Sequence, residues 1–398
     1  MDSTYRRKGP GSHHAILFRA GAHPGRFCRM NIASVEVYQY PLGYRFGNYV
    51  MSGGRVVTTL PSTVVRLISD NGIDGWGETC PLGSTYLNAH AAGAIAALQL
   101  LGPAVVGLDP TNLFGIRAAM DGAIMGHNYA KSPIDIACWD LFGKAVGRPV
   151  VDLLGGRIND SLPMYKAVPL GDVRSMVEFV LDQKAGGIHR FQLKVGADPR
   201  QDAARCLAVV DATDAGDTIL ADANGGWRRQ DAIVAARLME GADRLYLEQP
   251  CPTLAECLLV RQNTNLPMIL DEVIVDVNTL VDAAQAGGME AINLKLNRVG
   301  GLTPAKLMRD TAVALGIRLT IEDSWGGDLM SAAVSHLGAS TPPHALFAVS
   351  FMNDWTDNQI AGYHPKSVNG IGAAPLGPGL GIEVDHSKLG APLFSWKR

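Results

Sequence analysis

Three acidic residues each end a short apolar run in the middle of the chain. The runs Ile-Leu-Ala, Leu-Tyr-Leu and Met-Ile-Leu directly precede Asp222, Glu248 and Asp271. Each run predicts a buried β-strand with its carboxylate at the carboxyl end. Three carboxylates that meet in a small space cannot all stay ionised without a cation between them, and single hard oxygen ligands suit Mg²⁺. These residues are therefore candidate ligands of one Mg²⁺ ion, the alternative being three unrelated helix caps or ion pairs.

Two lysines flank this acidic set. Lys194 ends the run Arg-Phe-Gln-Leu-Lys one predicted strand earlier, and Lys295 ends Ile-Asn-Leu-Lys one strand later. A lysine in a dry pocket beside a divalent cation has its ammonium form disfavoured, so it can accept a proton near neutral pH. Lys194 and Lys295 are the candidate catalytic bases, although either could instead be a carboxylate partner without chemistry.

The elements that position these residues recur at a regular spacing. Strand-like runs alternate with helical stretches, and their ends are 23 to 28 residues apart; we expect strands to end at Lys166, Lys194, Asp222, Glu248, Asp271, Lys295, Glu322 and about Val349. Eight such units predict an α/β fold, a (β/α)₈-type barrel with its last unit modified, in which strand carboxyl ends converge on the active site. A doubly wound sheet would also alternate, but no GxGxxG follows the first strand.

Four segments are expected along the chain. Residues 1–29 are predicted to be a disordered tail, and residues 30–156, with strands followed by helices, an α+β capping domain. Within it, Lys131–Val146 reads as an amphipathic helix. Residues 157–370 form the predicted barrel, and the Gly- and Pro-rich residues 371–398 are expected to run back over the capping domain.

Composition excludes several classes of protein. Of the 398 residues 47% are hydrophobic and 18% charged, which supports a sizeable core and excludes global disorder. The net charge of −3 argues against a nucleic-acid-binding protein. The longest apolar stretch, Ala91 to Gly107, contains Gln99 and Pro103 and is typical of a helix in a water-soluble protein, so no membrane partner is expected.

The cysteines point to a reducing compartment. The six cysteines are scattered, form no CxxC pair and have no zinc spacing. We expect reduced thiols and a cytoplasmic protein, and we also expect a homo-oligomer.

The constellation resembles the enolase superfamily, specifically the muconate-lactonizing-like branch of the mandelate racemase/muconate lactonizing enzyme family. The motifs that carry the resemblance are Gln192-Leu-Lys194, Asp222-Ala-Asn224, Glu248-Gln-Pro250, Asp271-Glu272 and Lys295 before Arg298-Val-Gly-Gly301. The resemblance covers residues 30–390 and implies Mg²⁺-assisted removal of the proton α to a substrate carboxylate. The family pattern has Lys-x-Lys on the second strand, whereas Gln192 stands at its first position here.

The resemblance also implies a substrate class. The segments 80–86, 126–132 and 322–328 resemble members that act on proline-type amino acids. The expected activity is dehydration of cis-3-hydroxy-L-proline, a small-molecule carboxylate, which would make the protein a lyase. The alternatives are 2-epimerisation of proline or hydroxyproline betaine or another amino-acid racemisation, and less so cycloisomerisation or sugar-acid dehydration. The segment 347–351 lacks the tryptophan of the betaine enzymes, which favours the dehydratase.

Five further residues are candidates for binding the substrate: Asp323, Tyr86, Trp325, Gln192 and Phe351. Asp323 is expected to bind a substrate ammonium group, because it is a carboxylate beyond the metal set. Tyr86 and Trp325 could line an apolar ring or form cation–π contacts, or could simply pack. Residues 44–55 are expected to form a mobile lid or a hairpin turn.

Two other classes explain less of the sequence. A Schiff-base aldolase on the same barrel would use Lys194 or Lys295 covalently, but it leaves the three acids without a role. A non-catalytic ligand-binding barrel would be expected to have lost a metal ligand or a base, and every one of these positions is filled.

Overall fold

The computed structural model describes residues 30–398, so the predicted tail at 1–29 lies outside the described residues. Eight parallel strands form one curled sheet in chain order, which confirms the predicted barrel. The strands are β7 (Lys166–Val168), β8 (Arg190–Lys194), β9 (Thr218–Asp222), β10 (Leu245–Glu248), β11 (Met268–Leu270), β12 (Ala291–Lys295), β13 (Arg318–Glu322) and β14 (Leu346–Val349). An isolated bridge between Met164 and Val349 joins the two edges of the sheet.

Two predicted strand ends need correction. Lys166 begins β7 instead of ending it, and Asp271 comes one residue after the last residue of β11. The other six predicted ends agree with the structure. The difference of one residue at the end of β11 does not change the position expected for Asp271. The parallel pairing of β11 with its neighbours still carries this side chain to the same edge of the barrel.

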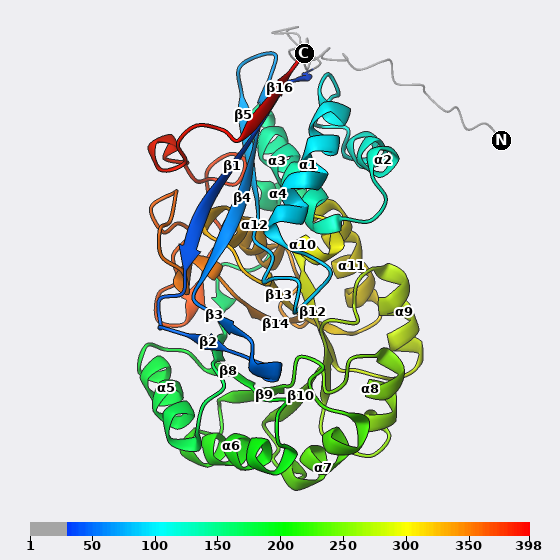
Figure 1. Cartoon of the computed structure of the whole chain (residues 1–398), viewed down its shortest axis with the longest axis vertical. Helices are drawn as coiled ribbons and strands as arrows, with labels where there is room; N and C mark the ends of the chain where they lie inside the picture. The colour runs from blue at the N-terminus through cyan, green and yellow to red at the C-terminus, as the bar shows by residue number, and fades with distance from the viewer. Residues whose placement is uncertain (1–29) are drawn as a thin grey trace, which may run out of the picture.

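Helices follow the barrel strands and pack around the sheet (Figure 1). They are α5 (Val173–Ala185), α6 (Pro199–Ala212), α7 (Arg229–Met239), α8 (Leu254–Arg261), α9 (Val277–Gln285), α10 (Leu296–Val299), α11 (Leu302–Ala314) and α12 (Asp328–Ala339). Within the described part of the chain, β14 is followed by the short 3₁₀ helix η2 (Met352–Asp354) instead of a full helix, so the last unit is modified.

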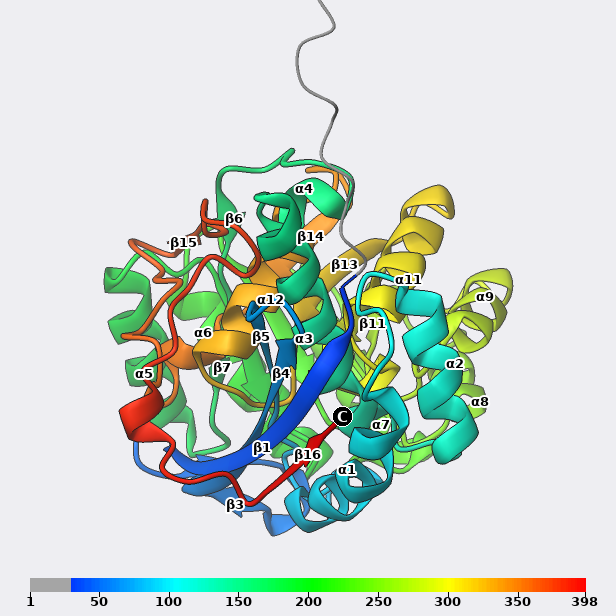
Figure 2. The same cartoon turned by 90° about the horizontal axis from the view of Figure 1, so that it is seen from above.

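A second sheet and four helices precede the barrel (Figure 2). The antiparallel strands β1 (Ile32–Gly43), β4 (Thr59–Ser69) and β5 (Asp74–Thr79) lie beside α1 (Ala91–Val105), α2 (Leu113–Ala123), α3 (Asn128–Val146) and α4 (Val150–Leu153). The C-terminal strand β16 (Phe394–Lys397) pairs with β1 and completes this sheet. Short pieces β6 (Leu162–Pro163), β15 (Ile371–Gly372) and η3 (His386–Lys388) complete the chain.

Helix α3 differs from the amphipathic helix that its sequence predicts, because it is buried on nearly every side between the sheet and the barrel. Two glycines of β5 allow this close packing. A Cβ atom at Gly77 would lie 2.0 Å from the Pro133 carbonyl oxygen, and one at Gly75 would lie 2.3 Å from that of Ala137. The polar residues of α3 therefore face a protein surface and not water.

Residues 44–57 include a hairpin that reaches over the barrel mouth, and the segment 44–55, expected to be a lid or a hairpin turn, forms most of it. Its strands β2 (Tyr49–Val50) and β3 (Val56–Val57) are antiparallel and enclose the 3₁₀ turn η1 (Ser52–Gly54). Figure 1 shows this hairpin between the capping sheet and β8 to β10.

Buried acids of the capping domain hold the first turns of barrel helices. Glu78 on β5 accepts hydrogen bonds from the backbone N–H groups of Gly327 and Met330, both at 3.0 Å, at the start of α12. Asp135 on α3 accepts one from Thr303 N at 2.9 Å at the start of α11. Helix N-termini carry unsatisfied N–H groups and partial positive charge, so these carboxylates fix the orientation of the capping domain on the barrel.

Among the helices of residues 30–398, none combines the length and the apolar character that crossing a bilayer would require. Cys80, Cys138, Cys206, Cys251 and Cys257 are buried free thiols.

His336 on α12 joins three parts of the chain. Its Nδ1 accepts a hydrogen bond from Val151 N at 3.2 Å, and its Nε2 lies 3.0 Å from the Leu380 carbonyl oxygen. Since one partner donates and the other accepts, the ring must be the neutral tautomer with its proton on Nε2. Burial lowers the pKa of His336 to about 4 from 6.5.

We predict that His336 makes stability depend on pH. As the pH falls from 6.5 to 4, the unfolded chain protonates this histidine while the folded protein does not. The free energy of unfolding should therefore decrease over this range, by on the order of 3 kcal/mol for this residue. Urea unfolding across the range should give a flatter profile for His336→Gln than for the wild type. His344→Gln, at an exposed position, serves as control, and an unchanged slope in His336→Gln would contradict the assignment.

Candidate active site

The carboxyl ends of five consecutive strands bring the predicted acids and lysines together. Lys194 on β8 is in register with Asp222 on β9, and Asp222 with Glu248 on β10. Asp271 follows β11, and Lys295 ends β12. All five side chains are buried, and the three carboxylates are 0% exposed. A group of charges this deeply buried must be neutralised within the protein.

The lysines neutralise two of the three acids directly. Lys194 Nζ donates to Asp222 Oδ2. Lys295 Nζ lies 2.6 Å from Asp271 Oδ2, and Arg298 Nη2 lies 2.6 Å from Asp271 Oδ1. Burial opposes ionisation of Asp271, but the two cations outweigh it and lower its pKa. Within residues 30–398, no three His, Cys, Asp or Glu side chains are close enough together to hold a metal ion as they stand.

Glu248 is the acid without a cationic partner. Its Oε1 accepts hydrogen bonds from Gln192 Nε2 and Asn293 Nδ2, both at 2.7 Å, while its Oε2 is buried and has no partner among the described residues. Burial, followed by the charges of Asp222 and Asp271, raises its pKa well above the ordinary value. A buried carboxylate oxygen with no donor, between two further carboxylates, fits a divalent cation with hard oxygen ligands.

Neighbouring side-chain and backbone groups orient these carboxylates. Asn224 donates from its backbone N to Asp222 Oδ1 at 2.8 Å, and from Nδ2 to Asp222 Oδ2 at 2.9 Å and Glu272 Oε1 at 3.0 Å. Gln249 Oε1 accepts from Asp271 N at 2.9 Å. Asn224 and Gln249 have φ of 46° and 33°, a left-handed backbone that costs energy in non-glycine residues and clusters at functional sites.

Tyr86 brings the capping domain into the site. Its hydroxyl lies 3.2 Å from Asp271 Oδ2 and 2.9 Å from Lys295 Nζ. Burial raises its pKa well above 10, so the phenol stays protonated. A single residue of the capping domain therefore contacts one candidate ligand and one candidate base.

The hairpin closes the site above Lys194. Tyr49 and Met51 line a cavity of only about 20 Å³ together with Lys194, Lys295 and Gln192. The Lys194 ammonium lies 6.0 Å from the centre of the Tyr49 ring. The hairpin therefore leaves little more space than one water molecule needs beside the two lysines.

Trp325 and Phe351 do not line this cavity. The Trp325 ring packs against Tyr49, with ring centres 5.4 Å apart, so it supports the hairpin. Phe351 is fully buried and faces Gly372, where an added Cβ would lie 2.6 Å from the ring. Met352 and Trp355 line the cavity from the same loop instead. The Phe351 side chain therefore points away from this cavity, a direction that its position in a loop does not determine.

Asp323 lines the cavity but is also held by the backbone. Its Oδ2 accepts from Asn297 N at 2.7 Å and its Oδ1 from Ser324 N at 2.6 Å. Burial raises its pKa to about 6. Each oxygen keeps one lone pair for a further donor, so a structural role and contact with a cation are compatible.

Glu322, which lies at the predicted seventh strand end, also borders this cavity. Its Oε1 lies 3.5 Å from Lys295 Nζ, and its Oε2 accepts from the Tyr165 hydroxyl. Burial, followed by the charge of Asp323, raises its pKa well above the ordinary value. Its register with Lys295 across β12 and β13 is the signal that could have identified it.

Comparison with known proteins agrees with this geometry. Residues 48–155 match the mandelate racemase/muconate lactonizing enzyme N-terminal domain, and residues 175–388 match the enolase C-terminal domain-like model. The chain is 44% identical to cis-3-hydroxy-L-proline dehydratase of Roseibium aggregatum, over 92% of this chain and 99% of that protein. It is 28% identical to N-succinyl-L-Arg/Lys racemase of Bacillus cereus, over 90% of this chain and 97% of that protein.

A solved structure carries the same fold. A mandelate racemase/muconate lactonizing enzyme from Roseovarius nubinhibens complexed with magnesium has a TM-score of 0.89 and 34% identity, covering 92% of this chain and all of that one. The similarity spans both domains.

The free oxygen of Glu248 gives a prediction about metal binding. Glu248→Gln removes the charge of that oxygen, so we expect Mg²⁺ affinity measured by calorimetry to fall at least about tenfold. Glu256→Gln on the surface of α8 is the matched control and should bind Mg²⁺ as the wild type does. Equal Mg²⁺ affinity in both variants would exclude Glu248 as a ligand.

Proposed function

Because the chain belongs to the mandelate racemase/muconate lactonizing enzyme family of the enolase superfamily, we propose that it dehydrates cis-3-hydroxy-L-proline. One observation carries the chemistry: two buried lysines, Lys194 and Lys295, flank the carboxylates at the ends of β9 to β11. The 44% identity to a cis-3-hydroxy-L-proline dehydratase supports the choice of substrate.

Asp222, Glu248 and Asp271 would hold Mg²⁺. When bound, the ion would neutralise the charge that develops on a substrate carboxylate as the α-proton leaves. The buried Oε2 of Glu248 supports this role, since it has no other partner among the described residues.

Lys194 would accept the α-proton. Burial disfavours its ammonium form, but Asp222 outweighs burial in this structure and raises its pKa. Once Asp222 serves as a metal ligand, Lys194 loses that carboxylate partner, and burial then favours the neutral amine that a base requires.

Lys295 would assist departure of the 3-hydroxyl. In cis-3-hydroxy-L-proline the α-hydrogen and the hydroxyl lie on opposite faces of the ring, so anti elimination needs a base on one face and an acid on the other. The electrons of the α C–H bond form the C=C bond, and the hydroxyl leaves as water with a proton from Lys295. The resulting enamine tautomerises to the cyclic imine acid, a pyrroline carboxylate.

The substrate's ring nitrogen would be recognised by acids on the seventh strand. The nitrogen is a cation at neutral pH, and Asp323 lines the cavity beside Lys295 and Glu322. Because both oxygens of Asp323 already accept backbone N–H groups, this carboxylate is fixed in place before the substrate arrives.

Racemisation or epimerisation is the second candidate. Two lysines on opposite sides of the acids would equally return a proton to the other face of a substrate without a leaving group. The 28% identity to a racemase supports this alternative.

The dehydratase is tested by following cis-3-hydroxy-L-proline in D₂O with Mg²⁺ by NMR. We expect the cyclic imine acid to form, and a chelator to stop its formation. Exchange of the α-proton of proline betaine, with no imine from the hydroxyproline, would replace the dehydratase by the epimerase.

The two lysines are predicted to have separable roles. Lys194→Ala should lose both α-proton exchange and imine formation, each by about 10²- to 10⁴-fold. Lys295→Ala should lose imine formation by a similar factor but retain exchange from the L-substrate, since Lys194 still removes the proton. Lys306→Ala on α11, where Lys306 pairs with Asp310 on the helix surface, is the control. Equal loss of exchange in both active-site variants would refute this division.

A further inference from the structure

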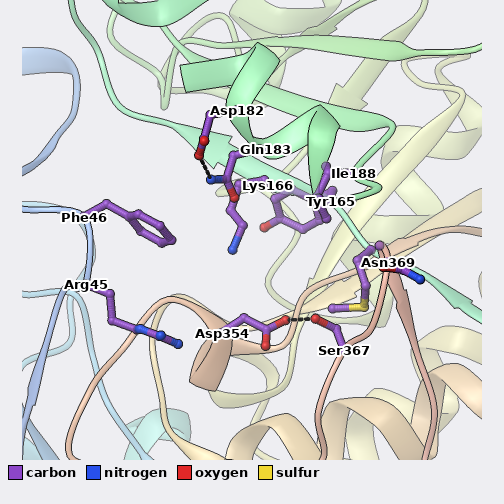
Figure 3. A pocket seen from close by; sticks show the side chains of 13 residues that line it. Arg45, Phe46, Tyr165, Lys166, Asp182, Gln183, Ile188, Asp354, Ser367 and Asn369 are labelled. Atoms are coloured by element: carbon purple, nitrogen blue, oxygen red, sulfur yellow. Dashed lines mark hydrogen bonds between the residues drawn. The ribbon is translucent and has the colours of Figure 1, made fainter. Parts of the chain in front are cut away.

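A second cavity lies outside the barrel wall and is much larger than the one at the lysines. It has a volume of about 340 Å³. Figure 3 shows Lys166 of β7 pointing into its open centre, with Phe46 and Arg45 approaching from the hairpin side and Asp354 from the loop after β14. Tyr165 borders both cavities, so a single layer of side chains separates them.

Lys166 stands apart from the other buried cations. The lysines and arginines that are buried within residues 30–398 are Lys131, Lys166, Lys194, Lys295 and Arg309. Four of them have a carboxylate within 4.0 Å: Asp121, Asp222, Asp271 and Asp310 are the respective partners. Over the same residues, the Lys166 ammonium has neither an ion pair nor a hydrogen bond, although the residue is only 6% exposed.

Aromatic rings take the place of a carboxylate. The Lys166 ammonium lies 5.2 Å from the ring centres of both Phe46 and Trp355. These contacts only partly replace water, because burial still lowers the pKa of Lys166 to about 8. Asp354 raises this pKa from a distance, and its Oδ2 accepts from Ser367 Oγ at 2.5 Å.

Arg45 supplies a second cation to the same cavity. Its guanidinium lies 5.6 Å from the ring centre of Tyr363. Within the described chain its side chain makes no hydrogen bond or ion pair, while its backbone N donates to Trp355 O at 2.9 Å and fixes the loop. Two cations from different parts of the fold therefore face one cavity without a carboxylate partner.

We propose that this cavity is a second binding site, which takes the carboxylate group of a small organic acid between Lys166 and Arg45. The carboxylate would offset the desolvation of the Lys166 ammonium and accept hydrogen bonds from both cations. Phe46 would cover the apolar part of the acid. A phosphate dianion fits less well, since Asp354 and Asp182 also line the cavity and would repel the second charge.

Occupation of this site would act on the hairpin. Arg45 and Phe46 precede β2, and Tyr49 and Met51 of the same hairpin line the cavity at Lys194. A bound carboxylate would link Arg45 on the hairpin side to Lys166 on the barrel, and so favour the closed position. This inference does not depend on the metal or on the proposed reaction.

The test uses trifluoroacetate as the probe, followed by ¹⁹F NMR on the full-length protein with Mg²⁺ and again with a chelator. We expect binding that persists with the chelator. We also expect Lys166→Met and Arg45→Gln each to weaken it at least about tenfold, the loss of one charge-assisted hydrogen bond. Lys306→Met is the matched control and should bind as the wild type does. Arg45 is exposed, so Arg45→Gln tests the site even if Lys166→Met fails to fold.

The outcomes separate this site from the active site. Binding that disappears with the chelator and is unaffected by Arg45→Gln and Lys166→Met would overturn the second site and leave the dehydratase proposal untouched. Competition by acetate and by L-proline then identifies the occupant. Equal competition supports a simple organic acid, and stronger competition by L-proline supports an amino acid whose ammonium group faces Asp354.

Discussion

Six carboxyl groups and three cations lie together at the carboxyl ends of β8 to β13, and all of them except Glu272 and Arg298 are buried. The acids are Asp222, Glu248, Asp271, Glu272, Glu322 and Asp323, and the cations are Lys194, Lys295 and Arg298. Because the acids outnumber the cations, some carboxyl groups must be protonated or a further cation must enter. Burial, followed by the charge of Asp271, raises the pKa of Glu272 to about 7. This shift follows from the same excess of carboxylates over cations. The rest of the molecule serves as the scaffold that stabilises this group of buried charges.

The capping domain meets this constraint in two ways. Glu78 and Asp135 hold the first turns of α12 and α11, which fixes the domain on the barrel. That fixed position brings the Tyr86 hydroxyl within 2.9 Å of Lys295 Nζ. The hairpin is held by backbone hydrogen bonds from Arg45 N to Trp355 O and from Leu170 N to Val50 O, and by the packing of Tyr49 against Trp325. The capping domain therefore reaches Lys295 through Tyr86 and borders Lys194 through the hairpin.

Much of the site could be predicted because the barrel converts sequence spacing into proximity. Asp222, Glu248 and Lys295 follow apolar runs, and parallel strands carry such residues to one edge. Side-chain direction outside strands could not be predicted in this way, and Phe351 turned out to face Gly372. Helix α3 is buried on nearly every side, although its sequence predicts an amphipathic helix, for a related reason. Its polar residues face protein, since Asp135 binds a neighbouring helix, and periodicity alone does not distinguish such a partner from water.

The contrast between Lys194 and Lys166 shows how pairing relates to chemistry in this fold. Both ammonium groups are buried, and both lie about 5 to 6 Å from an aromatic ring. Lys194 has Asp222, whereas Lys166 has only the rings and a more distant Asp354. An unpaired buried ammonium lowers stability, so its presence is explained more readily by a ligand than by folding. The two lysines border cavities that share Tyr165, and residues of the same hairpin line both of them. A ligand in one cavity would therefore change the packing around the other.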